Sequence, residues 1–258
     1  REGRRRRRPR PRLGAPVSDG LKRLPAKILA CRRLPHAHVR LCQSLGLPES
    51  VGGKSLALLT CDQDDSLYAA LDHATKIADV EVVYARSFYA GSAHASGPLS
   101  GEILGVLAAD EPESIERGVT AVEFALEHLF AFYEVEGGGV TLFPTVIGRV
   151  GRYLAAEAKV PVGSALGYFI APPLEAMVGV DAALKAAEVT LVRLFGPSTT
   201  TNVTVQNGYT RTPPTATLTA MLGEGQVTAL RDVIAPLGRN GLRDLRNEVH
   251  RYLALSFS

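Results

Sequence analysis

The 258-residue chain has few of the residues that mark a disulfide-stapled or membrane-spanning protein. Its three cysteines, Cys31, Cys42 and Cys61, are too few and too scattered for a disulfide framework or a CxxC metal pair. No uninterrupted run of roughly 18 apolar residues occurs, which argues against a transmembrane helix. The 46% of hydrophobic residues can nevertheless fill the core of one large domain or of two ordinary ones. We therefore expect a soluble globular protein of a reducing cytosol.

Motifs that carry catalysis or nucleotide binding are also missing. The sequence has no HExxH, no GxSxG, no P-loop and no GxGxxG after a strand. His36 and His38 alternate in an expected loop, which is weak evidence for a metal site. His73 follows Asp72 on an expected helix, where a solvated helix face is the simpler interpretation. These absences predict a protein that is not an enzyme and that has no cofactor or metal.

Positive charge is concentrated at one end of the chain. Residues 1–40 carry 14 Lys and Arg against Glu2 and Asp19, a net charge of +12, so the rest of the chain carries −9 of the overall +3. The stretch REGRRRRRPRPR could neutralise nucleic-acid phosphates, but a disordered tail or translated upstream sequence would have the same alternation of Arg and Pro. No apolar stretch follows it, which argues against a secretory signal. We expect a disordered tail over residues 1–22 and no nucleic-acid partner.

Hydrophobic periodicity predicts alternating strands and helices in the rest of the chain. Residues 21–34 are expected to form a strand or a short helix, and further strands are expected at 55–60, 80–90, 101–108, 164–172, 189–196 and 215–222. Helices are expected after Asp65 as far as Ala78, and at 111–133, 143–160, 173–187 and 225–237. This alternation predicts an α/β (α+β) fold.

One helix-to-strand segment occurs twice. A shift of 109 residues aligns 70–83 with 179–192 and gives six identities in 14 positions. The identical pairs are Asp72/Asp181, Ala74/Ala183, Lys76/Lys185, Ala78/Ala187, Val80/Val189 and Val83/Val192. Two unrelated amphipathic helices would share some Ala and Val, but hardly an Asp and a Lys in the same register as well. The chain is therefore expected to be two copies of one α/β unit, each with a sheet of about four strands and two helices.

Three carboxylates are gathered where the strand at 55–60 ends and the repeat helix begins: Asp62, Asp64 and Asp65. An aspartate at a helix start accepts hydrogen bonds from free backbone N–H groups, so one of the three is expected to cap the helix. Three acids exceed what capping needs. The cluster therefore also suggests a site for a cation, either a metal or an ammonium group.

The segment ALGYFIAPPLEAMVGVDAALKAAEVTLV resembles the signature of bacterial microcompartment shell domains. That signature has a strand, an Ala-rich helix with D-x-x-x-K-x-A, and a V-x-L-V strand, here at Asp181, Lys185, Ala187 and 189–192. The first copy, DQDDSLYAALDHATKIADVEVVYARSFYAGSAH, is more similar to one branch, the ethanolamine-utilisation EutL family of tandem, circularly permuted shell proteins. This resemblance extends from about residue 55 to 195.

The resemblance implies two shell domains, at 23–140 and 141–258, with a divergent C-terminal part. It also implies a homotrimer that imitates a hexamer, tiles with neighbouring shell proteins, and carries pores for small metabolites such as ethanolamine. The expected location is the microcompartment shell in the bacterial cytoplasm, with no membrane contact. An unrelated duplicated α/β regulatory module that binds a small ligand between its halves remains the alternative.

The same resemblance assigns candidate site residues. A small pore between the two domains would bind ethanolamine through Asp64 and Glu102, with Phe132 as an aromatic partner and Asp65 capping or supporting the helix. The loop at 88–98 would line or gate a central opening through Phe88, Tyr89, Gly91, Ser92 and His94. Lys76 and Lys185 would make lattice contacts at the edge of the tile, because a lysine stem can lie along a neighbour while its ammonium bonds carbonyl oxygens.

Overall fold

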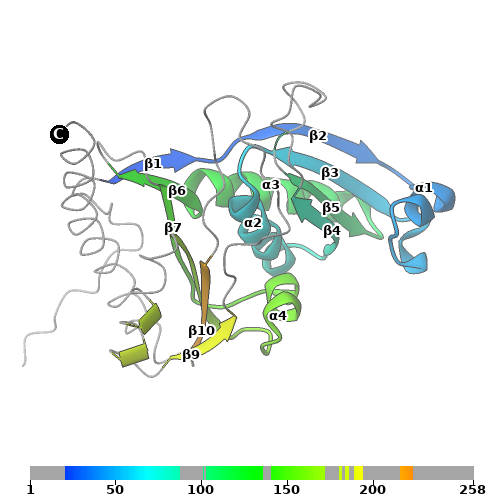
Figure 1. Ribbon diagram of the computed structural model, residues 1–258. Helices are drawn as coiled ribbons and strands as arrows, with labels where there is room; N and C mark the ends of the chain where they lie inside the picture. Colours follow the sequence, from blue (N-terminus) through cyan, green and yellow to red (C-terminus); the bar gives the residue numbers. More distant parts are fainter. Residues whose placement is uncertain are drawn as a thin grey trace, which may run out of the picture.

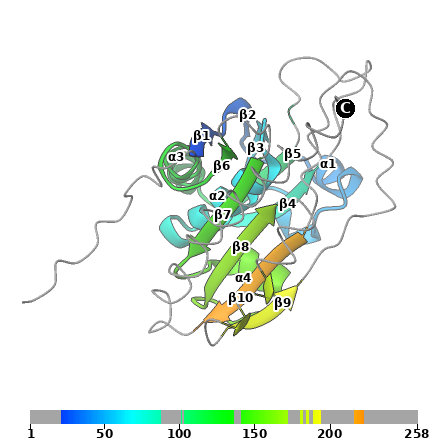
Figure 2. The same cartoon turned by 60° about the vertical axis from the view of Figure 1, so that its left-hand side comes forward.

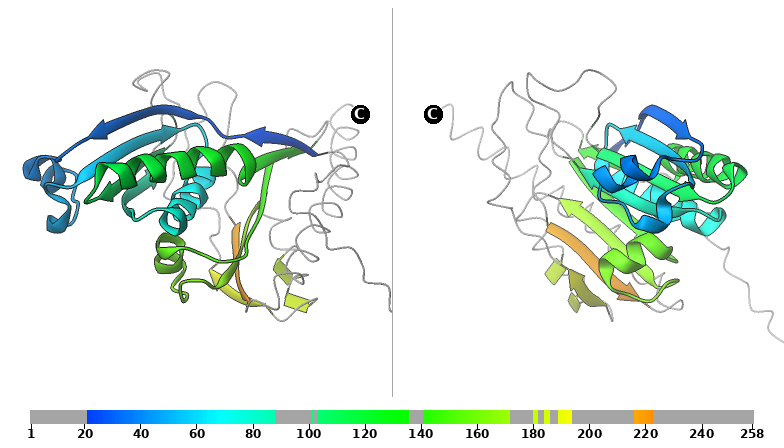
Figure 3. Two further views of the ribbon diagram at one scale, coloured as in Figure 1. Left: turned by 180° about the vertical axis from the view of Figure 1, so that it is seen from behind. Right: turned by 90° about the vertical axis from the view of Figure 1, so that its right-hand side faces the viewer.

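The computed structural model describes residues 21–87, 101, 103–135, 141–171, 180–181, 184–185, 189–193 and 216–222. Within these ranges, ten strands form two antiparallel sheets with helices packed against them (Figure 1). Strands β1 and β2 follow each other as a nearly continuous ribbon that links the sheets (Figure 3). The predicted α/β class is confirmed.

The first sheet has the order β2-β3-β5-β4. Its strands are β2 (Ile28–Leu34), β3 (Ser55–Cys61), β4 (Glu81–Ser87) and β5 (Ile103–Ala109). Helices α2 (Asp64–Ile77) and α3 (Pro112–His128) cover one face, and the short helix α1 (Val39–Ser44) with a 3-10 turn (Glu49–Val51) covers the other. Neighbouring β3 residues alternate between the two cores, Leu59 facing α2 and α3 while Leu56 faces α1.

The second sheet has the order β1-β6-β7-β8-β10-β9. Its strands are β1 (Leu21–Pro25), β6 (Ala131–Val135), β7 (Thr141–Ile147), β8 (Ala165–Ala171), β9 (Thr190–Arg193) and β10 (Ala216–Leu222). Figure 2 shows β7, β8, β10 and β9 side by side. Helix α4 (Arg152–Ala158) lies beneath α2 and contacts it (Figure 1). The domain boundary expected at residue 140 falls between two paired strands of this sheet, β6 and β7.

The two sheets repeat one topology. The order β2-β3-β5-β4 of the first sheet recurs as β7-β8-β10-β9 in the second. The remaining strands, β1 and β6, pair antiparallel, with Arg23 opposite Tyr133 at the centre. A shift of 110 residues equates Leu21 with Ala131 and Pro25 with Val135. The two outermost pairs, Leu21↔Val135 and Pro25↔Ala131, are therefore exchanged. A local two-fold relation therefore joins the halves, as expected for a duplicated unit.

A corner ahead of the central strand also recurs in both halves. In the first half, the Ala37 N–H donates to Lys54 O at 2.9 Å, and Gly53 N–H donates to Ala37 O at 2.9 Å. In the second half, Val150 N–H donates to Ser164 O at 2.8 Å, and Gly163 N–H donates to Val150 O at 2.9 Å. Gly53 and Gly163 have φ of 86° and 88°, values that favour glycine. The bonds equate Ala37 with Val150, and hence α1 with α4.

Two predicted helices differ from the structure. The helix expected at 111–133 ends at His128, and the chain continues as β6, whose short apolar stretch extends the helical pattern by chance. The helix expected at 143–160 was wrong over its first part, because residues 141–147 form β7 and α4 begins at Arg152. Pro144 argues against a strand, because proline has no backbone N–H to donate to a neighbouring strand. Among the described residues, however, Pro144 is paired only with Phe169 of β8. A proline without an N–H is tolerated where one side of a strand is unpaired.

A buried carboxylate joins the two halves of the chain. Asp72 of α2 is 0% exposed, and its oxygens accept hydrogen bonds from Gly151 N–H at 2.7 Å and Leu154 N–H at 2.9 Å at the start of α4. The Lys76 ammonium lies 3.3 Å from the Asp72 carboxylate and donates to Arg149 O at 3.0 Å. The charge is therefore both hydrogen-bonded and paired, which is what its burial requires.

We predict that Asp72→Asn lowers the free energy of unfolding by about 1–3 kcal/mol, because an amide nitrogen then faces a buried backbone N–H and Lys76 loses its anion. Urea unfolding followed by circular dichroism measures the change. The matched control is Asp110→Asn, whose side chain is 80% exposed and lies 3.4 Å from Lys54; it should change stability by less than about 0.5 kcal/mol. Equal losses in the two variants would contradict the role of Asp72.

Candidate functional site

The polar residues between β3 and α2 fix the bend between β1 and β2. The Asp62 carboxylate accepts a hydrogen bond from Lys27 N–H at 2.7 Å. Gln63, which is 7% exposed, donates through its amide to Leu24 O at 3.0 Å and accepts from the Ser66 hydroxyl at 2.8 Å. These contacts anchor the start of α2 to the ribbon that links the sheets.

Asp64 lies at the first position of α2 and links the helix to the end of β4. One carboxylate oxygen accepts from Asp65 N–H at 2.8 Å, and the other accepts from the Ser87 hydroxyl at 2.7 Å. The Tyr68 hydroxyl accepts from Ser87 N–H at 2.9 Å, and burial raises the pKa of that tyrosine. Asp64 therefore makes a hydrogen bond at the start of the helix and a second one to the end of β4.

Asp65 reaches the second sheet instead. Its carboxylate accepts a hydrogen bond from the hydroxyl of Tyr168 in β8. Tyr168 is a largely buried residue, and burial, reinforced by the negative charge of Asp65, raises its pKa well above the ordinary value. The Asp65 side chain therefore bridges the two halves of the chain, and its expected role in capping or supporting the helix stays a prediction.

Of the other pore residues, Phe132 of β6 is 8% exposed and its ring centre lies 5.0 Å from that of Phe143, within the main core. Glu102 lies outside the described residues. Its neighbours Gly101 and Ile103 lie beside the end of β3, since Ile103 pairs with Cys61 and a Cβ on Gly101 would overlap the Cys61 carbonyl. The described part of the site thus combines Asp64 with a mostly covered aromatic ring.

The expected gate residues Phe88, Tyr89, Gly91, Ser92 and His94 lie outside the described residues. Both expected lattice lysines are described. Lys76 makes its contacts at the junction with α4, and its side chain is 25% exposed. Lys185 is 73% exposed and its ammonium lies 2.6 Å from Asp181. The tile-edge role of both lysines stays a prediction.

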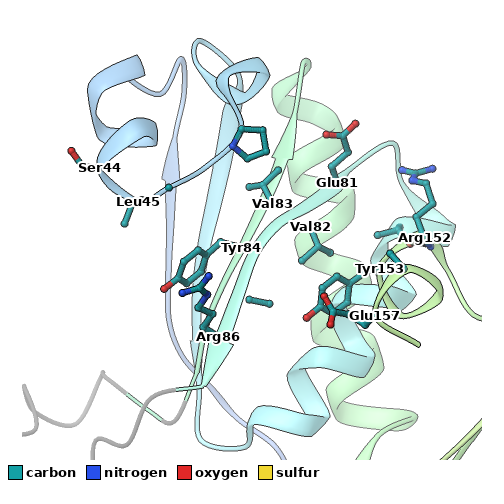
Figure 4. Close-up of a pocket in the computed structure, with 15 residues that line it drawn as sticks. Ser44, Leu45, Glu81, Val82, Val83, Tyr84, Arg86, Arg152, Tyr153 and Glu157 are labelled. Carbon is teal, nitrogen blue, oxygen red and sulfur yellow. Dashed lines mark hydrogen bonds between the residues drawn. The ribbon is translucent and has the colours of Figure 1, made fainter. Parts of the chain in front are cut away.

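A groove of about 810 Å³ lies between the end of α1, strand β4 and helix α4 (Figure 4). Arg86, Arg152, Glu81 and Glu157 give it mixed charge, and the Arg86 guanidinium lies 5.6 Å from the centre of the Tyr84 ring. Sequence patterns did not reveal this groove, because segments far apart in the sequence line it. No helix among the described residues is long and apolar enough to span a membrane, and no group of three or more candidate metal ligands occurs there.

Four further members of the polar network at the start of α2 were not predicted: Gln63, Tyr68, Ser87 and Tyr168. Gln63 and Tyr68 could have been suspected, because they lie within one helical turn of the acids. Ser87 and Tyr168 could not, because they reach the network from β4 and β8.

We predict that stability falls as the pH rises above about 10, because the buried tyrosines ionise in the unfolded chain but stay protonated in the folded one. Tyr168→Phe should cost about 1–2 kcal/mol at neutral pH through loss of the Asp65 hydrogen bond. The free energy of unfolding of this variant should also decline less steeply at high pH, so the difference in stability between the variant and the parent should become smaller. Urea unfolding across this pH range measures both effects, with Tyr133→Phe in β6 as the control for loss of a hydroxyl. A gap that widens with pH would contradict this account.

Comparison with known proteins places this geometry in a family. No protein-family model matches the chain. The chain is 45% identical over 150 residues to the bacterial microcompartment shell protein EutL of Clostridium perfringens, covering 58% of this chain and 69% of that protein. It is 40% identical over 176 residues to the protein of the same name from Salmonella typhimurium, covering 68% of this chain and 80% of that protein.

A solved structure agrees with the sequence relatives. The crystal structure of the ethanolamine utilization protein EutL from Leptotrichia buccalis superposes with a TM-score of 0.70 at 37% identity, covering 84% of this chain and 94% of that one. The likeness therefore extends over both halves and not just over the repeat helix. The chain belongs to the EutL family of bacterial microcompartment shell proteins.

Proposed function

We propose that this chain is a structural wall protein of an ethanolamine-utilisation microcompartment in the bacterial cytoplasm, and that it catalyses no reaction. The observation that carries the proposal is the repeated strand order of the two sheets, in a chain of the EutL family. A chain with two equivalent domains fills six positions with three copies, so a closed ring of three chains presents six similar edges. Membership of this family leaves the duplicated regulatory module without support.

The proposed assembly is a homotrimer that tiles with neighbouring shell proteins. Lys185 supports the tiling, because its exposed side chain can lie along a neighbour while its ammonium bonds carbonyl oxygens. Lys76 already makes a bond of this kind to Arg149 O within the chain. The same pair of lysines is therefore proposed to contribute to contacts between tiles.

We predict that the purified protein forms extended sheets in electron micrographs and that Lys185→Ala gives fewer and smaller sheets. The physical reason is the loss of a long stem and a triple hydrogen-bond donor from the rim of the tile. Lys159→Ala, at the end of α4, is the matched control. Normal sheets from the Lys185 variant would remove this lysine from the lattice.

The small pore is proposed to pass ethanolamine, an ammonium cation with a hydroxyl group. Asp64 and Glu102 would attract the ammonium, and the face of the Phe132 ring would add a cation–π contact. Asp64 keeps lone pairs for this purpose, because each of its oxygens accepts one hydrogen bond from the helix start or from Ser87. Binding should be weak, since each solvated ion pair contributes about 1 kcal/mol or less.

We predict that Asp64→Asn combined with Glu102→Gln abolishes measurable ethanolamine binding and leaves the oligomer intact. Isothermal calorimetry or ligand-observed NMR measures the affinity, and light scattering measures the mass of the oligomer. Asp110→Asn, an exposed acid at the end of β5, controls for the loss of a negative charge. Unchanged affinity in the double variant would place the site elsewhere.

A further inference from the structure

The groove beside β4 runs along a strand edge with which no other described strand pairs. β4 ends the strand order β2-β3-β5-β4, so its second edge faces the groove between the end of α1 and helix α4 (Figure 4). Just before β4, Val80 O accepts a hydrogen bond from the Arg152 guanidinium at 2.7 Å. At the other end, the Ser87 N–H donates to the Tyr68 hydroxyl at 2.9 Å. Side chains thus bind the two ends of this edge, and residues 81–86 lie between them.

This edge presents backbone hydrogen-bonding groups to the groove. Along an antiparallel strand, residues that bond the neighbouring strand alternate with residues whose N–H and C=O point away from it. Ser87 and Ala85 share one orientation, because they pair with Ile103 and Gly105 of β5, two positions apart in each strand. The Ser87 N–H bonds Tyr68 and not β5, so the N–H and C=O of Ala85 also point away from β5, toward the groove. An unpaired edge of this kind is a template for a further strand.

A bulge in β4 brings two opposite charges to one side of the strand. Glu81 and Arg86 are five positions apart, which would place them on opposite faces of a regular strand. The register shifts between Val82 and Tyr84, so the strand holds one extra residue there. Accordingly, Val82 and Ala85 both pack on the core beside α2, whereas Tyr84 packs on the core beside α1. The exposed Glu81 and Arg86 therefore lie with Tyr84 on the α1 side of the groove.

The size of the groove matches a short extended peptide. One residue of a strand occupies about 160 Å³, given a rise of about 3.3 Å, a strand spacing of about 4.8 Å and a layer thickness of about 10 Å. The groove of about 810 Å³ therefore holds about five residues. About five residues would also face positions 81–86, because two residues of β4 take the place of one at the bulge. The end of α1 and helix α4 wall the groove, which leaves room for a single strand and not for the edge of another sheet.

We propose that this groove binds an extended segment of a partner protein, which adds to β4 as an antiparallel strand with an acidic residue beside Arg86 and a basic residue beside Glu81. Every described strand pair is antiparallel, and such a segment continues the same hydrogen-bond pattern. The acidic residue therefore comes first in the segment, and the basic residue follows four positions later. The residues between them face Tyr84 on one side and the apolar surface of Val82 and Tyr153 on the other. Main-chain hydrogen bonds would supply affinity, and the alternating side chains would supply specificity.

The test uses the full chain and two capped pentapeptides of the same composition. Acetyl-Glu-Val-Thr-Val-Lys-amide has the proposed order of charges, and acetyl-Lys-Val-Thr-Val-Glu-amide has the reverse order. Ligand-observed NMR titrations should show that the parent binds the first peptide about fivefold to tenfold more tightly, since opposite charges face each other only in that complex. The double variant Glu81→Lys with Arg86→Glu should prefer the second peptide by a similar factor. Equal affinities, or a preference of the parent for the second peptide, would overturn the proposal.

Ala85→Pro tests the strand pairing separately from the charges. Proline removes the N–H that faces the groove, and it is tolerated at the open edge of a strand. The urea midpoint of this variant should stay close to that of the parent, and its binding of the first peptide should be lost. Ala85→Ser keeps the N–H and is the matched control, which should bind as the parent does.

A folded Ala85→Pro variant that binds the first peptide as tightly as the parent would overturn the strand pairing. If this variant does not fold, the exchange of charges at Glu81 and Arg86 still decides the proposal. A parent that binds neither peptide would also overturn it, because the edge would then be closed to partners. That result would leave the proposed wall function untouched, since the groove is formed within a single copy of the chain.

Discussion

The buried carboxylate of Asp72 is the interaction on which the relation between the two halves depends. A fully buried negative charge needs several hydrogen-bond donors, and it finds them at Gly151, Leu154 and Lys76. Two of these donors belong to the second half of the chain, so the charge is satisfied when α2 lies on the start of α4. Gly151 permits the approach, because any larger residue would overlap α2. The contact between α2 and α4 is thus the arrangement that satisfies this buried charge.

The start of α2 shows how a cluster of acids can serve construction and chemistry together. Asp62 binds the backbone at Lys27, Asp64 binds Ser87, and Asp65 binds Tyr168. Each side chain secures a different segment to the start of the helix, and the candidate ammonium site lies where these segments meet. A weak pore site on this scaffold would be pre-organised, because the partners of Asp64 hold its carboxylate in place.

Duplication allowed the two copies of the same motif to take different environments. Asp72 and Lys76 lie at the junction inside the chain, whereas Asp181 and Lys185 are exposed and pair with each other. Identical residues therefore have different surroundings, because the chain has one junction between its halves and the first copy of the motif occupies it.

Several features could be predicted from the amino-acid sequence alone. The repeated Asp and Lys in one register established the duplication, and β-branched runs such as that of β4 established most strands. The strand β7 could not be predicted, because Pro144 disfavours a strand and the pairing with β8 comes from residues 19 to 27 positions away. The ring contact of Phe132 and the hydrogen bond of Asp65 were decided by Phe143 and Tyr168, which lie in the other half. Sequence periodicity reports which residues share a face of one element, whereas the partner of a buried charge or ring is set by the packing of elements far apart in the chain.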